Sequence, residues 1–305
     1  MEALDRQSGA GPNETGEDTA PPVVAFQGEA GAFSEEALFT HFGEGAHTLP
    51  CRNFRQVGEA VMQGTATFGV LPVENTLAGS VQGAYDVLIG GGLEITGEIV
   101  IPIRHHLLGV PRSSLEEVRK VISHPVALAQ CTDFLSKRPQ MQAVAVYDTA
   151  GAAQQVSKDG DPTVAAIASR GAAERYSLEL LAEEIQDRDD NQTRFFVIRK
   201  GGSRSEEKRD PALSYKTVVV LELRDQPGSL LQVLEPFAER GIDLSKLESR
   251  PATVPWRYRF ILELRADMDT PEAEEAVEEA RRRTSVLAVL GSFPAARTRK
   301  VSDLD

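Results

Sequence analysis

The residues best suited to chemistry lie in one short segment. The polar residues Asn191, Thr193 and Arg194 run directly into the apolar stretch 195–198. A run of aromatic and β-branched residues predicts a buried strand, which places the polar side chains at its edge, where a cleft can use them. There a hydroxyl and an amide can hydrogen-bond a ligand, and a guanidinium can hold a carboxylate. Adjacent strand residues face opposite sides. If Thr193 faces substrate, Arg194 faces away from it and instead braces the strand or the acidic loop 187–190.

Two further segments carry polar side chains at the ends of expected strands. Glu74 and Asn75 follow the apolar stretch 68–71, and Ser123 and His124 end the stretch that begins at Val121. Glu74 is a general acid if burial raises its pKa, or a structural carboxylate that accepts backbone N–H bonds. His124 is an acid or base, or it is a hydrogen-bonding residue at the end of its strand.

Three helices are expected to begin beside small residues, at Ser34, Ser80 and Thr149. The free N–H groups and the dipole of a helix N-terminus favour anions. Simple capping is the alternative for each helix taken alone. Together with the polar strand edge, the three helix starts indicate a cleft for a molecule that bears carboxylates.

The elements that must position these residues alternate along the chain. From Val23 onward, short apolar strands alternate with amphipathic helices, which predicts an α/β fold with mostly parallel sheets. The β-rich passage 95–110 is expected to carry the chain to a second lobe, and the strand at Thr193 to return it. A polar linker follows at 201–214. The β-α-β-β-α-β order of segment 215–294 then predicts a ferredoxin-like α+β module, with tails at 1–22 and 295–305.

Composition and charge exclude several classes of protein. The chain has 305 residues, 41% hydrophobic and 26% charged, as expected of a globular protein of two or three domains. Its apolar runs are far shorter than the ~20 residues of a membrane helix. A formal net charge of −13 argues against general nucleic-acid binding. Two cysteines and an N-terminus without a signal peptide indicate a cytoplasmic location.

The sequence motifs also do not predict a metal site, a phosphate-binding loop or a cysteine nucleophile. His105 and His106 are adjacent on an expected strand, so they face opposite sides and no metal site is predicted. Gly90-Gly91-Gly92 lacks the Lys-Ser/Thr ending of a phosphate loop. Neither Cys51 nor Cys131 has a neighbour in the sequence that would activate it as a nucleophile.

Several segments together resemble the prephenate dehydratase family. In order they are Gln27 to Ser34, Gly69 to Ser80, Ser123-His124-Pro125 with Gln130-Cys131, Thr193-Arg194-Phe195, and Glu248 to Pro251. The resemblance covers roughly Val23 to Phe293. It implies a two-lobed, periplasmic-binding-protein-like α/β catalytic domain at 23–200, followed by an α+β ferredoxin-like ACT regulatory domain at 215–294. It also implies a cofactor-free conversion of prephenate to phenylpyruvate in phenylalanine biosynthesis. Because segment 1–22 is too short for a chorismate mutase domain, a monofunctional enzyme is expected.

The resemblance also implies roles for residues of the cleft. Thr193 is expected to hydrogen-bond the leaving oxygen or relay a proton to it, with Glu74 and Asn75 as catalytic partners. The residues expected against the substrate are Phe33, Ser34, Ser80, Ser123, His124, Gln130, Thr149, Asn191, Arg194 and Phe195.

Two motifs of the C-terminal module resemble the family's effector site. Gly228-Ser229-Leu230-Leu231 resembles a Gly-Ala-Leu motif, with Ser229 in place of alanine, and Glu248-Ser249-Arg250-Pro251 matches the family's motif as it stands. They imply L-phenylalanine binding between paired ACT domains of a homodimer or homotetramer, with lower activity as the consequence. A module that serves only dimerisation is the alternative.

Two other functions remain open on the sequence. The acidic loop 185–191 resembles plant-type arogenate enzymes, which carry out the same chemistry on an amino-bearing substrate. A two-lobed α/β domain also suits a non-catalytic sensor that binds amino acids or other solutes, since such lobes commonly only hold ligands.

Overall fold

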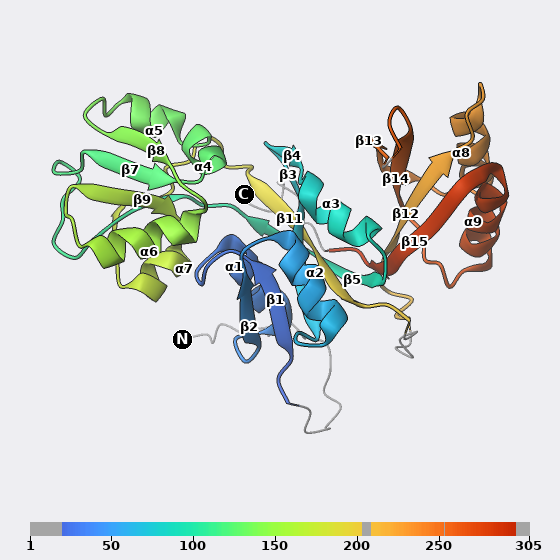
Figure 1. Cartoon of the computed structure of the whole chain (residues 1–305), viewed down its shortest axis with the longest axis horizontal. Helices are drawn as coiled ribbons and strands as arrows, with labels where there is room; N and C mark the ends of the chain where they lie inside the picture. Colours follow the sequence, from blue (N-terminus) through green and yellow to red (C-terminus); the bar gives the residue numbers. More distant parts are fainter. Residues whose placement is uncertain (1–19, 203–208, 253, 297–305) are drawn as a thin grey trace, which may run out of the picture.

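The computed structural model describes residues 20–202, 209–252 and 254–296. Three bodies lie in a row, with the first lobe in the middle, the second lobe on one side of it and the C-terminal module on the other (Figure 1). Most of the segments 1–22 and 295–305 that are expected to be tails, and part of the linker 201–214, lie outside the described residues. The described helices include none that is long and apolar enough to span a membrane.

The first lobe is built on a sheet of strand order β2-β1-β3-β11-β5. β1, β2 and β3 are parallel, whereas β11 runs antiparallel between β3 and β5. A short strand, β4, pairs with the end of β3. Its elements are β1 (Val23–Gln27), α1 (Phe33–Phe42), β2 (His47–Cys51), α2 (Phe54–Gln63), β3 (Phe68–Asn75), β4 (Gly79–Ser80), α3 (Gln82–Ile89), β5 (Leu93–Pro102) and β11 (Gln192–Lys200).

The second lobe has a sheet of strand order β10-β6-β9-β7-β8. The chain enters it after β5 and leaves it before β11, so the lobes are joined by two crossings, at 103–105 and 183–191. Its elements are β6 (His106–Gly109), β7 (Lys120–Ser123), α4 (Pro125–Ala129), α5 (Thr132–Ser136), β8 (Gln142–Ala145), α6 (Thr149–Asp159), β9 (Val164–Ala168), α7 (Arg170–Tyr176) and β10 (Glu179–Ala182).

The lobes touch where the loop after β1 meets α7. Gly31 has a φ of +86°, and a Cβ there would lie 2.7 Å from the Cα of Ala172. Ser169 donates a hydrogen bond to the carbonyl oxygen of Gly31 at 2.5 Å. Only glycine permits this approach, because any side chain would push the lobes apart.

The C-terminal module has the expected β-α-β-β-α-β order and an antiparallel sheet, β13-β14-β12-β15. α8 and α9 cover one face, where Val219 and Leu262 meet Phe237. The other face packs on the first lobe, in a shared cluster that includes Val218 and Phe196. Its elements are β12 (Tyr215–Leu223), α8 (Ser229–Glu239), β13 (Leu244–Pro251), β14 (Tyr258–Leu264), α9 (Pro271–Arg283) and β15 (Thr284–Pro294).

One expected element differs from the structure. The helix predicted to begin at Ser80 begins at Gln82 instead. Ser80 lies in β4, where it pairs with Glu74 of β3. Because its backbone takes part in strand pairing, Ser80 is not at a helix N-terminus, and the expected anion site there is wrong.

Candidate active site

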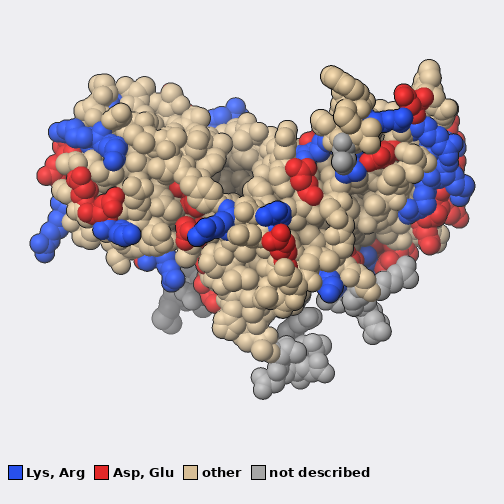
Figure 2. Space-filling model, viewed as in Figure 1, with Lys and Arg blue, Asp and Glu red and all other residues tan. Residues whose placement is uncertain are grey.

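A chain of hydrogen-bonded polar side chains joins the lobes at the start of β11. The amide nitrogen of Asn75 donates to the hydroxyl oxygen of Thr193 at 2.9 Å and to the Oδ1 of Asn191 at 2.8 Å. Asn191 Nδ2 donates to Gln130 Oε1 at 3.0 Å, and His105 Nε2 lies 2.9 Å from the same oxygen. We call these five residues the cleft chain. It runs from β3 and β11 in the first lobe to the residue after α4 in the second. Figure 2 shows that the surface is hollowed between these two lobes.

The side chain of Asn75 is fixed by the backbone of the turn that follows it. Its Oδ1 accepts hydrogen bonds from the N–H groups of Leu77 and Ala78, at 3.0 and 2.8 Å. β3 places Asn75 directly opposite Thr193 of β11. The amide of Asn75 is therefore fully engaged within the protein, and it orients the Thr193 hydroxyl instead of contacting a ligand itself.

Thr193 is the member of the chain that is ready to donate. Its oxygen accepts from Asn75, and the described residues provide no acceptor for its proton. Thr193 is largely buried, with 9% of its surface exposed. A ligand oxygen in the cleft can take this hydrogen bond, which is stronger where water is excluded.

Gln130 and His105 complete the chain on the second lobe. Gln130 Oε1 is used by Asn191 and His105, which leaves the Nε2 group of Gln130 to face a ligand. Burial lowers the pKa of His105, so the ring is neutral at pH 7. Its Nδ1 has no partner among the described residues, and its ring meets Phe33 edge-on at 5.5 Å. His105 was expected to lie on a strand with His106 and was given no role. It lies instead just before β6, in the crossing between the lobes.

Three of the expected substrate residues are engaged elsewhere. The buried hydroxyl of Ser123 donates to Ile167 O at 2.6 Å and ties β7 to β9. His124 caps α4, accepting from the N–H of Val126 at 3.2 Å. Phe195 is 1% exposed and packs in the core that the two lobes share.

The two remaining helix starts offer different environments. Thr149 begins α6, but Asp148 caps this helix, and its carboxylate already accepts from the N–H of Gly151. Ser34 lies in the first turn of α1, whose N-cap Ala32 contributes no side-chain hydrogen bond. The N-terminus of α6 is thus already occupied by an anion.

The expected partner residue Glu74 lies on the opposite side of β3 from the cleft chain. Arg194 Nη2 donates to its carboxylate at 2.7 Å, and Lys246 of the C-terminal module lies at 3.3 Å. Burial favours a higher pKa for Glu74, but the hydrogen bond and charge of Arg194 and the charge of Lys246 outweigh it and lower the pKa. Glu74 is therefore ionised at neutral pH, and the raised pKa that a general acid needs is not found.

Arg194 is likewise directed away from the cleft, as the alternation of strand residues predicts. It contacts Glu98 of β5 at 3.2 Å and Glu263 of β14 at 2.7 Å, in addition to Glu74. The braced partners are these carboxylates, and not the loop 187–190. Burial alone lowers the pKa of an arginine, but the hydrogen bonds and charges of these carboxylates raise that of Arg194 above its ordinary value.

Ser80 and the motif Glu248-Ser249-Arg250-Pro251 meet on this same side. Ser80 donates to Glu248 at 2.6 Å and accepts from Lys246 at 2.7 Å. Arg250 donates to Glu248 at 2.9 Å and to the carbonyl oxygen of Gln82 at 2.9 Å. Glu248 and Arg250 therefore face the first lobe, whereas Ser249 between them is exposed.

These contacts give stability a defined pH dependence. Burial opposes ionisation of Glu74 and Glu248, but their basic partners lower both pKa values below the ordinary 4.5. A lowered folded pKa means that the stabilisation is complete above the unfolded value and is lost as pH falls through the folded value. The part of the free energy of urea unfolding that Glu74 and Glu248 contribute is expected to be fully present from about pH 7 to 5.5 and to be lost below about pH 4.5. Glu74→Gln and Glu248→Gln should each show a shallower fall. An unchanged slope in both variants would contradict the assignment.

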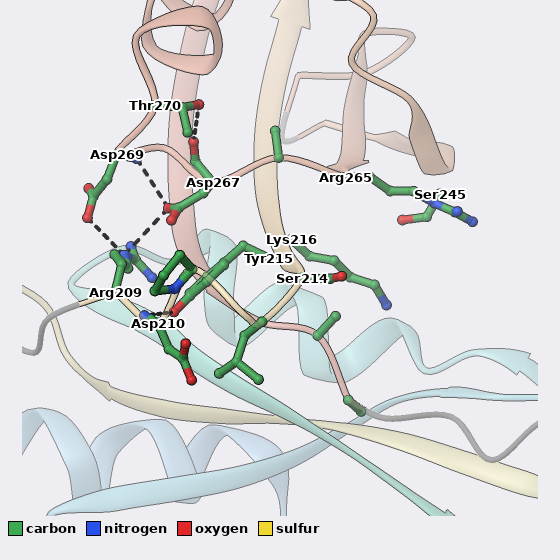
Figure 3. Close-up of a pocket in the computed structure, with 15 residues that line it drawn as sticks. Arg209, Asp210, Ser214, Tyr215, Lys216, Ser245, Arg265, Asp267, Asp269 and Thr270 are labelled. Carbon is green, nitrogen blue, oxygen red and sulfur yellow. Dashed lines mark hydrogen bonds and ion pairs between the residues drawn. The ribbon is translucent and has the colours of Figure 1, made fainter.

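Two hollows are lined by residues other than those of the cleft chain. One of about 950 Å³ is lined by residues of α1, β2 and α7. Another of about 860 Å³ lies where the linker meets the C-terminal module (Figure 3). In the second, Arg209 is held by Asp267 and Asp269 at 3.5 and 2.8 Å and stacks on Tyr215. Its cation is already neutralised, so this hollow is a poor anchor for a substrate carboxylate.

Comparison with known proteins decides the family. A family model described as "Prephenate dehydratase" matches residues 24–203, and one described as "ACT domain" matches residues 217–282. The chain belongs to the prephenate dehydratase family. The two matches confirm the family, the enzyme class and the fold that the motifs predicted, which is a hydro-lyase domain followed by an ACT domain.

Curated relatives of this dehydratase family cover most of the chain. The bifunctional chorismate mutase/prephenate dehydratase of Aquifex aeolicus is 40% identical over 90% of this chain and 74% of that protein. Arogenate dehydratase/prephenate dehydratase 1 of Arabidopsis thaliana is 37% identical over 91% of this chain and 73% of that protein.

Solved structures of similar proteins share the arrangement. The prephenate dehydratase of Arthrobacter aurescens in complex with L-Phe aligns with a TM-score of 0.81 and 31% identity over 89% of each chain. GqqA, described as a novel type of quorum quenching acylase, aligns with a TM-score of 0.83 and 32% identity over 91% of this chain and all of its own.

The ACT motifs of this family member are well formed. Gly228 adopts a left-handed backbone, with φ of +80°, and caps α8. The hydroxyl of Ser229 donates to the carbonyl oxygens of Arg224 and Gln226, at 2.7 and 2.9 Å. The substitution of serine for alanine therefore adds a satisfied polar group at the helix start. Leu231 is exposed, Leu230 is partly buried, and Pro251 ends β13 at the surface.

Proposed function

We propose that this chain converts prephenate to phenylpyruvate, with Thr193 and its neighbours in the cleft chain as the active site. The ring C–O bond breaks and its oxygen leaves as water after gaining a proton. The bond to the ring carboxylate breaks in the same process, carbon dioxide leaves, and the electron pair of that bond completes the aromatic ring. The protein must orient the substrate and stabilise the departing oxygen.

The observation that carries the proposal is the hydroxyl of Thr193, which accepts from Asn75 and whose own proton has no acceptor among the described residues. A threonine hydroxyl is too weak an acid to give up its proton outright, so it hydrogen-bonds the leaving oxygen as the C–O bond breaks, or relays to that oxygen a proton taken up from the solvent pool. Gln130 Nε2 can orient the substrate carboxylate or hydroxyl, and the Phe33 ring provides an apolar surface for the dihydroaromatic ring.

The substrate is tested by presenting prephenate and arogenate to one preparation of the full chain. We expect turnover of prephenate, seen as phenylpyruvate, with kcat/KM higher than for arogenate. The acidic loop 185–191, which resembles that of plant-type arogenate enzymes, supports arogenate as the alternative. Consumption of neither compound by folded protein would refute the proposal.

Acylase activity is a less suitable assignment for this cleft. Acyl transfer from a hydroxyl nucleophile needs a base that removes its proton. Among the described residues, Thr193 receives a hydrogen bond from an amide and meets neither a carboxylate nor an imidazole. Hydrolysis of an acylated amide, assayed beside prephenate turnover, is expected at background level.

We further propose that L-phenylalanine binds the ACT domain and lowers activity in a homodimer or homotetramer, in a cytoplasmic location. Gly228 to Leu231 and Glu248 to Pro251 would form the effector site. Large apolar side chains are exposed on this domain, among them Leu231 at 72% and Trp256 at 92%, which supports burial against a second copy.

Calorimetry is expected to show phenylalanine binding, and saturating phenylalanine is expected to reduce prephenate turnover. Leu231→Glu should weaken both effects by placing a charge at the proposed interface. Sedimentation of the wild type and this variant tests the assembly. Absence of binding together with unchanged activity would leave the domain with a role in assembly alone.

A further inference from the structure

The ACT domain and the first lobe are joined by a network of eight charged side chains. Along this interface the backbones also approach closely, since a Cβ on Gly291 of β15 would lie 2.1 Å from the carbonyl oxygen of Ile95 in β5. The network's members are Glu74, Glu98 and Arg194 of the first lobe and Lys216, Lys246, Glu248, Arg250 and Glu263 of the ACT domain.

Opposite charges of the two domains meet in this network. The first lobe supplies one cation and two carboxylates, and the ACT domain supplies three cations and two carboxylates. Lys216 contacts Glu98 at 2.7 Å and Lys246 contacts Glu74 at 3.3 Å, so cations of one domain neutralise carboxylates of the other. Each domain alone would leave an unbalanced charge at a surface that is otherwise apolar.

Glu263 is the most buried of the ACT carboxylates, with 1% of the residue exposed. Its two oxygens accept from Nη1 and Nη2 of Arg194, both at 2.7 Å, and Tyr85 donates to one of them at 3.2 Å. This paired geometry fixes the plane and direction of the guanidinium more tightly than a single contact can.

Arg194 is the residue next to Thr193 on β11. β11 pairs Arg194 with Glu74 and Thr193 with Asn75. A guanidinium that is held in one place restrains the backbone of Arg194, and with it the backbone of the adjacent Thr193. Desolvating several charges is costly, and a buried ion pair often adds less stability than apolar packing. The effect of the Arg194–Glu263 pair that matters here is that it holds β11 in one position.

We propose that Glu263 of the ACT domain is a positioning residue for the catalytic strand, acting on Thr193 through Arg194. This inference rests on the proposed function. The ACT domain then contributes to the geometry of the active site even without effector, and a change in its position is transmitted to Thr193 by the shortest covalent route, one peptide bond.

Glu263→Gln in the full chain tests the proposal, because glutamine keeps the shape and removes the charge. We expect kcat for prephenate to fall by about 10- to 100-fold, as for a small displacement of a reacting group, with KM within about twofold of wild type. Amide hydrogen exchange in the segments 70–76 and 192–197 should become faster. Glu263→Asp, which keeps the charge but is shorter, should give an intermediate kcat, and it replaces the glutamine variant if that variant fails to fold.

Glu222→Gln is the matched control. Glu222 lies on the same ACT sheet and contacts Arg259 at 2.7 Å within the domain, so its loss should leave kcat and KM unchanged. A folded Glu263 variant with wild-type kcat, or with raised KM and unchanged kcat, would overturn the proposal. An inactive wild type would instead refute the proposed function, which keeps the two failures distinct.

Discussion

Replacing Thr193 with valine is expected to lower kcat for prephenate by about 10²- to 10⁴-fold, the usual contribution of a group that assists proton transfer. Valine matches threonine in shape and suits a strand, so the change removes the hydroxyl and little else. The affected interaction develops mainly in the transition state, so KM should change little. Initial rates of phenylpyruvate formation measure the effect, and circular dichroism shows whether the fold is kept.

Thr96→Val provides the control for this prediction. Thr96 lies on β5 of the same sheet, and its hydroxyl donates to Val197 O at 3.4 Å, away from the cleft chain. Its removal should leave kcat at the wild-type level. If Thr193→Val retained kcat within a few-fold, Thr193 would not be the group that assists the leaving oxygen.

Replacing Arg194 with glutamine is expected to lower the free energy of unfolding by about 3–5 kcal/mol, as when one partner of a buried ion pair is removed. The loss leaves the carboxylates of Glu98 and Glu263, both almost fully buried, without their shared cation. Urea denaturation followed by circular dichroism measures the change.

Arg259→Gln is the appropriate comparison for Arg194. Its partner Glu222 is partly exposed, so a loss of about 1 kcal/mol or less is expected. Equal losses for the two variants would show that the interdomain network is no more important to stability than an ordinary surface pair.

The strand that organises the site could be predicted from its own residues. Phe195, Phe196, Val197 and Ile198 give β11 an apolar core on both faces, and strand alternation separates Thr193 from Arg194. Pattern alone could not say what packs on each face. The partner of Arg194 lies 69 residues away in another domain, and no local spacing indicates it.

Glu98 and Glu263 were missed, although the sequence held a signal for both. Each is an acid flanked by apolar residues of its strand, and a charge buried at such a position requires a partner. The general-acid hypothesis for Glu74 was wrong because the cations that lower its pKa, Arg194 and Lys246, come from elements far along the chain. Ser80 was assigned to a helix because Gly79 suggested a helix start, whereas pairing with β3 holds it in a strand.

A crystal structure with bound phenylpyruvate tests the central claim most directly. We expect the product between the two lobes, with its ring near the Phe33 side chain. One of its oxygen atoms should lie within hydrogen-bond distance, about 3 Å, of the Gln130 amide or the Thr193 hydroxyl. The claim would be contradicted by product bound only beside Arg194 at the ACT interface, or only in the hollow at α1 and α7 or the hollow at the linker.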